Sequence, residues 1–313
     1  MQANAVIFEE PQKLIFDKTL MKETSEKSVV VETFWSGIST GTERLLWDGR
    51  MPSFPGMGYP LVPGYETVGR IVDAPSDHQD RVGELVFVPG CSAYEEVRGL
   101  FGGAASHLIT DVEKAFRVPE GLEEDAVLLA LAATAYHALR ENQSKLPDLI
   151  VGNGVLGRLA ARLCVSLGGN APVIWEKEWR RSNNPDGFHV INPEDHEGRQ
   201  YDCIMDMSGD ALLLDHLIQA LAPRGEVILA GFYPTPISFD FPPAFMKEAR
   251  LRISAEWQER DLVAVRDLVD AERLSLGGLI SHRSSADAAV EAYQTAFEDP
   301  ECLKMVLNWK EAS

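Results

Sequence analysis

A run of six residues, GNGVLG from Gly152 to Gly157, limits what this chain can fold into more than any other segment. It follows the apolar run LIV, which favours a strand. It opens the segment VLGRLAARLCVSLG, whose apolar and small residues recur with the period of a helix. A strand, a glycine-rich turn and a helix in direct succession predict one unit of a parallel sheet covered by helices.

The turn has the spacing G-x-G-x-x-G, and each glycine has its own physical role. The first permits the tight turn, the second lets the backbone approach a pyrophosphate, and the third lets helix and strand pack closely. The positive end of the helix then attracts phosphate groups. We therefore predict a dinucleotide site; the alternative is a turn without a ligand. The predicted binding residues at this turn are Gly152, Gly154, Val155, Leu156 and Gly157.

Glu176 ends the next predicted strand, 19 residues after Gly157. A carboxylate there accepts hydrogen bonds from an adenosine ribose 2′-hydroxyl and repels a 2′-phosphate, so the sequence favours NAD over NADP. Lys177, Arg180 and Arg181 follow directly, and they could pair with a phosphate or lie solvated on a surface turn. The other predicted cofactor residues are Thr134, Lys177, Ser208, Gly231 and Phe232.

Two patterns divide the chain. From Ala3 to Pro119, short β-rich runs are separated by Gly and Pro, which predicts a β-barrel-like domain. Residues 123–142 have the pattern of a helix, and strands alternate with helices after it, which predicts a doubly wound parallel sheet. The fold class is therefore α/β.

The later part of the chain contains its own stop signals. The sequence predicts a helix over 210–225 that is ended by Pro223 and Gly225, and an apolar strand over 226–232. Residues 284–309 have the pattern of a helix followed by a strand.

Charge and cysteine content exclude several classes of function. The 29 basic and 48 acidic residues give a net charge of -19, which repels phosphate backbones and argues against nucleic-acid binding. The four cysteines lie far apart in the sequence, without the spacing of a zinc lobe or a disulfide framework. We expect no transmembrane segment, because no apolar run reaches about 18 residues, and we expect a cytoplasmic protein.

Five segments resemble the medium-chain dehydrogenase/reductase superfamily: 36–43, 63–72, 118–139, the glycine motif and 279–307. The resemblance implies a GroES-like catalytic domain followed by a Rossmann domain, with the chain end returning to the first domain. The implied boundaries are 1–120 completed by 282–313 for the catalytic domain, and 121–281 for the NAD-binding domain. The implied activity is that of a nicotinamide-dependent oxidoreductase.

Zinc enzymes of that superfamily carry a G-I-C-G-T-D segment and a G-H-E segment, and this chain departs from both. Ser39 or Thr40 stands at the ligand cysteine, Tyr65 replaces the histidine, and a third ligand position falls near Ala130. Only Glu66 remains of the usual set. Zinc needs about four N, S or O ligands. We therefore predict that the chain holds no metal.

The longer segment 36–71 resembles a narrower family, the dehydrogenase of bacteriochlorophyll biosynthesis. Members of that family oxidise the 3-(1-hydroxyethyl) group of a chlorophyllide or bacteriochlorophyllide to 3-acetyl with NAD. The resemblance implies an NAD-dependent alcohol dehydrogenase with a tetrapyrrole substrate. Our hypothesis is that the conjugated macrocycle delocalises positive charge as hydride leaves, so that a metal matters less.

The predicted catalytic residues are the polar side chains of the matching segments: Ser39, Thr42, Glu43, Tyr65 and Glu66. The resemblance places at Thr42 a hydroxyl that begins a proton relay. A hydroxyl is too weak a base to keep the proton, so the relay needs a terminal acceptor, for which Glu43 and Glu66 are candidates. The alternative is that Thr42 and Glu66 are hydrogen-bonded structural residues.

The segment 44–63 has little helical or strand periodicity and is predicted to be a loop. Its aromatic and methionine side chains suit a flat apolar ring, and Arg44 or Arg50 could pair with a propionate. The alternatives are a cover over the end of the barrel or a homodimer contact, and delivery of the pigment by peripheral contact with a membrane stays open. The predicted substrate residues are Trp47, Arg50, Phe54, Met57 and Tyr59.

Two other functions fit the same fold. The first is a zinc-independent quinone or enone reductase that uses NADPH. The second is a non-catalytic NAD- or pigment-binding protein, which fold alone does not exclude.

Overall fold

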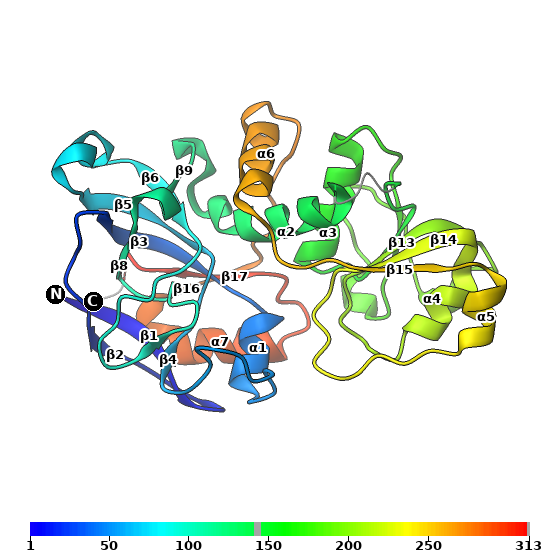
Figure 1. Cartoon of the computed structure of the whole chain (residues 1–313), viewed down its shortest axis with the longest axis horizontal. Coiled ribbons are helices and arrows are strands. Elements are labelled where there is room, and N and C mark those ends of the chain that lie inside the picture. Colours follow the sequence, from blue (N-terminus) through cyan, green and yellow to red (C-terminus); the bar gives the residue numbers. More distant parts are fainter. Residues whose placement is uncertain (141–144, 312–313) are drawn as a thin grey trace. The chain divides into compact units, whose positions relative to one another are not determined.

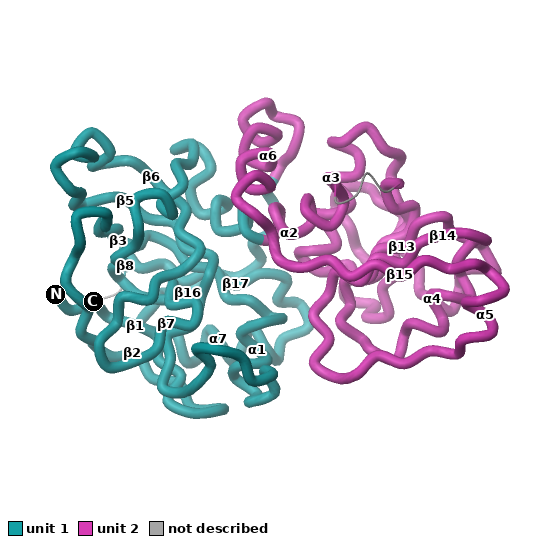
Figure 2. The backbone as a smooth tube through the Cα atoms, in the orientation of Figure 1, with its two compact units in different colours: residues 1–130, 276–313 teal, residues 131–275 magenta. Residues whose placement is uncertain are grey.

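The computed structural model describes residues 1–140 and 145–311. The chain forms two compact units, 1–130 with 276–313 and 131–275, which Figure 2 distinguishes by colour. The sequence places the boundaries at 120/121 and 281/282. The first boundary lies later because the 3-10 segment Glu120–Leu128 packs against strands of unit 1.

Unit 1 is built from two sheets. Its strands are β1 Gln2–Glu10, β2 Lys13–Leu20, β3 Ser28–Ile38, β4 Leu61–Val62, β5 Thr67–Asp73, β6 Leu85–Val88, β7 Arg98–Gly99, β8 His107–Asp111, β9 Phe116–Arg117, β16 His282–Ser285 and β17 Met305–Asn308. One sheet has the order β2-β1-β4-β7, and the other has the order β16-β17-β3-β5-β6-β9 with β8 also paired to β3. Its helices are α1 Thr42–Trp47 and α7 Ala289–Glu298, with 3-10 turns at Ser76–Arg81, Val112–Lys114, Glu120–Leu128 and Ala286–Ala288.

The end of the chain completes unit 1. Strand β17 pairs antiparallel with β3, and Figure 1 shows these two strands, from opposite ends of the sequence, side by side. The indole Nε1 of Trp309 donates to Ser36 Oγ at 2.8 Å. Because β3 leads directly to Ser39, the chain end supports the segment that carries the predicted catalytic residues.

Unit 2 is a parallel sheet with the order β12-β11-β10-β13-β14-β15, which is the 3-2-1-4-5-6 order of a doubly wound dinucleotide-binding fold. Its strands are β10 Leu149–Val151, β11 Val173–Trp175, β12 Val190–Ile191, β13 Tyr201–Asp206, β14 Leu221–Leu229 and β15 Arg250–Ile253. Its helices are α2 Leu129–Arg140, whose first two residues belong to unit 1, α3 Val155–Ser166, α4 Leu214–Ala220, α5 Phe241–Met246 and α6 Glu259–Asp270, with 3-10 turns at Trp179–Arg181 and Pro193–Asp195.

Two predicted helices differ from the structure. The helix expected over 210–225 is shorter, because Leu221 already pairs with Tyr201 in the sheet and the register shifts before Glu226, which leaves Pro223 and Gly225 in an irregular part of β14. The helix expected over 123–142 is interrupted at its start, where Glu123 has a φ of 45°, and its α-helical part begins at Leu129. Its last two expected residues, 141–142, lie outside the described residues.

The predicted loop 44–63 also contains regular structure. Helix α1 extends to Trp47, and Leu61–Val62 forms β4, which pairs with β1 and β7. The pairing of β4 anchors the end of the loop in the smaller sheet of unit 1. Among the described residues, no helix is long and apolar enough to span a membrane.

Candidate active site

The glycine turn between β10 and α3 has the shape that its sequence predicts. Gly152 has a φ of +104°, and a Cβ on Gly157 would lie 1.9 Å from the carbonyl oxygen of Gly152. A Cβ on Gly154 would meet no atom within 4 Å. Helix α3 begins after Gly154 without a side-chain cap, so no side chain at the cap competes for its first N–H groups. This space and these donors fit a pyrophosphate.

Glu176 follows β11 and turns its carboxylate back to the glycine turn. Its Oε2 accepts from the backbone N–H of Asn153 at 2.9 Å, and its Oε1 accepts from the N–H of Glu178 at 2.8 Å. A carboxylate has about four acceptor sites, so each oxygen keeps capacity for a ribose hydroxyl. The residues present therefore fit the adenosine half of a dinucleotide.

Asp206, at the end of β13, organises the next part of this sheet edge. Its carboxylate is buried and accepts from the N–H of Ser208 at 2.8 Å and from the Tyr233 hydroxyl at 2.7 Å. Burial raises the pKa of Asp206, and these hydrogen bonds oppose the shift. Gly231 is required here because a Cβ would lie 2.8 Å from the nitrogen of Gly209.

The remaining predicted cofactor residues are less constrained. Phe232 is 54% exposed, and Thr134 lies half-buried on α2. The Lys177 ammonium lies 3.2 Å from Asp210 Oδ2, and its side chain is 80% exposed. The pair joins the ends of β11 and β13 across the surface, and a phosphate would have to compete with Asp210 for this cation.

Three hydroxyl side chains meet in unit 1, between the end of β3, α1 and the segment before β5. The Tyr65 hydroxyl donates to Ser39 Oγ at 2.7 Å, and the backbone N–H of Thr42 donates to the same oxygen at 3.3 Å. Burial raises the pKa of Tyr65, although the Ser39 and Thr42 hydroxyls oppose the shift. Tyr65 therefore keeps its proton at neutral pH. Both lone pairs of Ser39 Oγ are taken, so the Ser39 hydroxyl is a donor towards any further partner.

Glu43 lies fully buried behind this cluster. Its Oε2 accepts from the Tyr293 hydroxyl of α7 at 2.7 Å, and its Oε1 accepts from the backbone N–H of Ser39 at 3.3 Å. Burial raises the pKa of Glu43 to about 8, and the nearby Glu66 carboxylate adds to the shift. The Glu43 side chain is therefore mostly neutral at pH 7.

Glu66 forms a buried ion pair with Lys304 of the C-terminal segment. The Lys304 ammonium also donates to the carbonyl of Ile38 at 3.0 Å, and neither charged side chain is more than 2% exposed. The other carboxylate oxygen of Glu66, Oε1, has no hydrogen-bond partner among the described residues. Burial raises the pKa of Glu66 and the Lys304 charge lowers it. Gly37 makes room for the pair, because a Cβ there would lie 2.1 Å from Glu66 Oε2.

These contacts bear on the predicted proton relay. Among the hydrogen bonds of the described residues, neither the Glu43 nor the Glu66 carboxylate meets the Ser39 hydroxyl. The carboxylates are committed to Tyr293 and Lys304 instead. This arrangement favours a structural role for Glu66, which is the alternative that the sequence leaves open.

The donor set is also unlike that of a zinc site. Ser39 and Tyr65 offer protonated hydroxyls, Ala130 offers a methyl group, and Glu66 is already paired with a fixed cation. Within the described parts of the chain, no three His, Cys, Asp or Glu side chains lie close enough together to hold a metal ion. Zinc bound by protein prefers thiolate, imidazole or free carboxylate ligands.

The predicted substrate residues lie in two environments. Trp47 packs edge-on against Phe8 at 5.7 Å, and the Tyr59 hydroxyl donates to the carbonyl of Leu46. Trp47, Met57 and Tyr59 are half-buried against the core of unit 1. Phe54 is 38% exposed, and the exposed Arg50 pairs with Asp48 at 2.5 and 3.2 Å. The packing of Trp47 and Tyr59 fits a cover over the barrel, whereas Phe54 and Arg50 remain accessible.

Sequence reasoning missed three residues of these sites. Lys304 interrupts the apolar segment CLKMVL, and a lone cation in a buried strand is a signal that could have found it. Asp206 ends an apolar strand in the same way that Glu176 does. Tyr293 lies on the expected core face of a helix and gives no such signal.

Comparison with known proteins decides the family. No family model matches the chain. The chain is 50% identical over 315 residues to the 2-desacetyl-2-hydroxyethyl bacteriochlorophyllide A dehydrogenase of Cereibacter sphaeroides, covering 99% of each chain. It is 50% identical over 313 residues to the protein of the same name from Rhodobacter capsulatus, covering 100% of both. The chain belongs to the bacteriochlorophyllide A dehydrogenase family. The narrower resemblance seen in the sequence is thereby confirmed.

Solved structures place this bacteriochlorophyllide dehydrogenase family member in the alcohol dehydrogenase fold. An Escherichia coli alcohol dehydrogenase solved with NADH has a TM-score of 0.85 at 19% identity, covering 98% of this chain and 99% of its own. A Geotrichum candidum acetophenone reductase solved with NAD has a TM-score of 0.83 at 18% identity, covering 98% and 97%. A zinc-binding dehydrogenase from Sinorhizobium meliloti solved with NADP has a TM-score of 0.82 at 19% identity, covering 98% and 99%. The predicted fold class is confirmed.

Glu43 gives this family member a testable pH dependence. Its carboxyl pKa is about 8 in the folded chain against a reference value of 4.5, so between these values the folded state holds a proton that the unfolded state has lost. The contribution of Glu43 to stability is full below pH 4.5 and falls as pH rises towards 8, by up to about 1.4 kcal/mol per pH unit. We expect Glu43→Gln, which stays neutral, to gain stability relative to the wild type from about pH 5 to about pH 8. Urea unfolding of both proteins across this range measures the difference, and a difference that does not change with pH would contradict the assignment.

Proposed function

We propose that this chain oxidises the 3-(1-hydroxyethyl) group of a chlorophyllide a or bacteriochlorophyllide a to a 3-acetyl group, as a step of bacteriochlorophyll biosynthesis. The observation that carries this proposal is 50% identity along the whole chain to proteins named for the hydroxyethyl bacteriochlorophyllide. The hydroxyl cluster of unit 1 and the nucleotide turn of unit 2 supply the groups that such an oxidation needs.

The cofactor is a nicotinamide dinucleotide, and we propose NAD rather than NADP. Gly152, Gly154 and Gly157 leave space for the pyrophosphate at the uncapped start of α3. Glu176 favours the free ribose hydroxyl because a 2′-phosphate would meet its negative charge. Ser208, Gly231 and Phe232 lie at the carboxyl ends of the following strands, where open α/β sheets bind the rest of their ligand. NAD, when bound, accepts the hydride from the carbinol carbon.

The Ser39 hydroxyl holds the substrate oxygen in this proposal. Tyr65 and the N–H of Thr42 occupy the lone pairs of Ser39 Oγ, so the serine donates its own hydrogen to the oxygen of the hydroxyethyl group. Tyr65, with its raised pKa, orients Ser39 and does not act as the base. Loss of hydride leaves a protonated ketone, which is a strong acid, and its proton passes to water.

No metal takes part in the proposed reaction. The side chains of Ser39, Tyr65 and Ala130 do not suit zinc, and the Lys304 ammonium already neutralises the charge of Glu66. Charge that develops at the carbinol carbon is delocalised into the conjugated macrocycle. The Lys304 ammonium therefore serves to hold Glu66. The substrate supplies part of the transition-state stabilisation that a metal ion gives in zinc-dependent dehydrogenases.

The pigment contact involves the loop after α1. Phe54 and Arg50 are the exposed members of the predicted set, so Phe54 stacks on the ring and Arg50 exchanges Asp48 for a propionate. Trp47, Met57 and Tyr59 support the loop from the core side. A homodimer and a peripheral membrane contact also remain proposals; the exposed Phe241, Phe245 and Met246 of α5 offer an apolar face for either.

A substrate panel tests the function. The purified full-length protein is mixed with 3-hydroxyethyl pigments of the chlorin and bacteriochlorin series, with NAD or NADP, and the red absorption band is followed. We expect a band shift and acetyl product with NAD, at least about tenfold faster than with NADP. Reduction of quinones or enones by NADPH without pigment turnover would favour the reductase. Tight binding of NAD and pigment without turnover would favour the carrier.

Ser39→Ala tests the proposed role of the serine. Because the variant removes the hydroxyl that orients the hydroxyethyl group for hydride transfer, we expect kcat to fall at least about tenfold while the Kd for NAD stays unchanged. Ser36→Ala is the matched control, since Ser36 lies on β3, three residues before Ser39, and accepts from the Trp309 indole instead. Single-turnover kinetics with the hydroxyethyl pigment measures both variants. If kcat falls by the same factor in both variants, the effect of Ser39 on turnover comes only from its contribution to the stability of the fold.

A further inference from the structure

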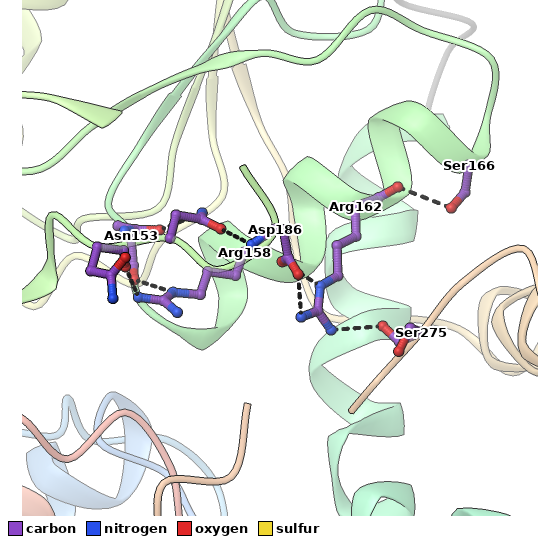
Figure 3. A network of polar contacts seen from close by, with 8 residues as sticks. Asn153, Arg158, Arg162, Ser166, Asp186 and Ser275 are labelled. Carbon is purple, nitrogen blue, oxygen red and sulfur yellow. Dashed lines mark hydrogen bonds and ion pairs between the residues drawn. The ribbon is translucent and has the colours of Figure 1, made fainter. Parts of the chain in front are cut away.

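A polar network joins helix α3 to the segment 181–186, which follows β11 and Glu176 (Figure 3). Arg158 is the centre of this network. It comes directly after Gly157, and its side chain is so enclosed that the residue is only 8% exposed. Its Nε donates to the carbonyl oxygen of Asn153 at 3.1 Å, and its Nη2 donates to the carbonyl oxygen of Asn183 at 2.7 Å. One guanidinium thus ties the glycine turn to the segment.

Asn153, the second residue of the glycine turn, makes the same connection with its side chain. It is fully buried, its Nδ2 donates to the carbonyl of Arg181 at 2.5 Å, and its Oδ1 accepts from Asn184 Nδ2 at 3.1 Å. Its backbone N–H is the group that holds Glu176 Oε2. Asn153 therefore couples the segment to the carboxylate proposed to bind the ribose.

Arg162, one turn further along α3, holds the far end of the segment. It binds Asp186 with two hydrogen bonds of 2.6 and 2.9 Å and donates to the carbonyl of Ser275 at 2.9 Å. Figure 3 shows Arg158 and Arg162 reaching from the same helix to different points of the segment. These acceptors of Arg162, Asp186 and Ser275, lie outside the glycine turn, which makes Arg162 a natural comparison for Arg158.

The two arginines differ in what their guanidinium groups bind. The buried guanidinium of Arg158 donates to two backbone carbonyls, and because the group is planar and rigid it fixes the positions of both carbonyls at once. Lysine has a single ammonium on a flexible stem and holds two such carbonyls less well. The Arg162–Asp186 pair is a bidentate ion pair whose side chains are 11% and 24% exposed, and it holds the segment at Asp186, three residues beyond Asn183. We expect its removal to cost stability and to leave the glycine turn in place.

We propose that Arg158 and Asn153 are positioning residues for cofactor choice: they hold segment 181–186 against the glycine turn and so keep Glu176 directed at the adenosine ribose. This inference rests on the proposed use of NAD. It assigns part of the preference for NAD to a residue of α3 whose hydrogen bonds go to backbone carbonyls of the glycine turn and of segment 181–186, in addition to the carboxylate itself.

Calorimetric binding of NAD and NADP to the full-length protein tests this role. For Arg158→Met we expect the Kd for NAD to rise about tenfold and the Kd for NADP to change less than about twofold. The ratio of the two Kd values, which measures the preference for NAD, therefore becomes smaller. At saturating NAD, kcat with the hydroxyethyl pigment stays within about twofold, because the reacting atoms are not touched. Arg158→Lys retains the charge and restores part of the preference.

Controls keep a folding defect apart from a positioning effect. Arg162→Met removes an arginine of the same helix, and we expect its NAD-to-NADP preference to equal that of the wild type. Asn184→Ala removes the hydrogen bond to Asn153 Oδ1 and the one that its own Oδ1 accepts from the Asp186 N–H, without altering α3. We expect it to shift the preference in the same direction as Arg158→Met by a smaller factor. Circular dichroism confirms that each variant is folded.

The outcomes are separable. Equal weakening of NAD and NADP in Arg158→Met, or the same narrowing in Arg162→Met, would overturn the positioning role. If Arg158→Met does not fold, Asn184→Ala decides, and an unchanged preference there overturns the inference. If the wild type binds neither NAD nor NADP, both the proposed function and this inference are overturned. If the wild type binds NAD and its preference for NAD over NADP is the same in Arg158→Met, only the inference is overturned.

Discussion

The buried pair of Glu66 and Lys304 is the interaction on which the arrangement of unit 1 depends. It joins the segment before β5 to the returning C-terminal strand, and Lys304 also holds the carbonyl of Ile38 next to Ser39. Both charges are removed from water, and the loss of one partner from a buried ion pair costs about 3–5 kcal/mol because the other is left uncompensated. The ion pair fits because Gly37 has no side chain, since a Cβ there would collide with Glu66 and Lys304. The backbone of β3 therefore sets the position of the ion pair beside the hydroxyl cluster.

The two units divide the chemistry by the kind of group they offer. Around Ser39, unit 1 presents protonated hydroxyls, a neutral Glu43 and a neutralised Glu66, so it supplies donors and no strong base. Unit 2 presents backbone N–H groups at the glycine turn and the carboxylate of Glu176, which suit a phosphate and a ribose. An oxidation in which the substrate stabilises its own developing charge fits such a site better than one that needs a metal-bound alkoxide.

Much of this arrangement could be predicted from local pattern. The glycine motif and the strand before it are contiguous signals, so the turn could be predicted from the sequence. Glu176 at the end of the next strand is a second local signal, and its role at the ribose stays a prediction. The short strands β12 and β15 and the early start of β14 at Leu221 could not be predicted, because pairing with distant strands decides them. Lys304 and Tyr293 meet Glu66 and Glu43 only after the chain returns to unit 1, and the interactions of Arg158 depend on the path of segment 181–186. Contacts between residues that are far apart in the chain produce no local pattern that a single sequence would show.

We propose that this family member oxidises a hydroxyethyl pigment without a metal, at the cluster of Ser39, Thr42 and Tyr65. The most direct measurement is turnover of the 3-hydroxyethyl pigment with NAD before and after exhaustive treatment with a zinc chelator, with the metal content of the same sample determined by mass spectrometry. We expect full turnover at a zinc content far below one ion per chain. Stoichiometric zinc in the active protein, with activity lost in chelator and restored by zinc, would contradict it.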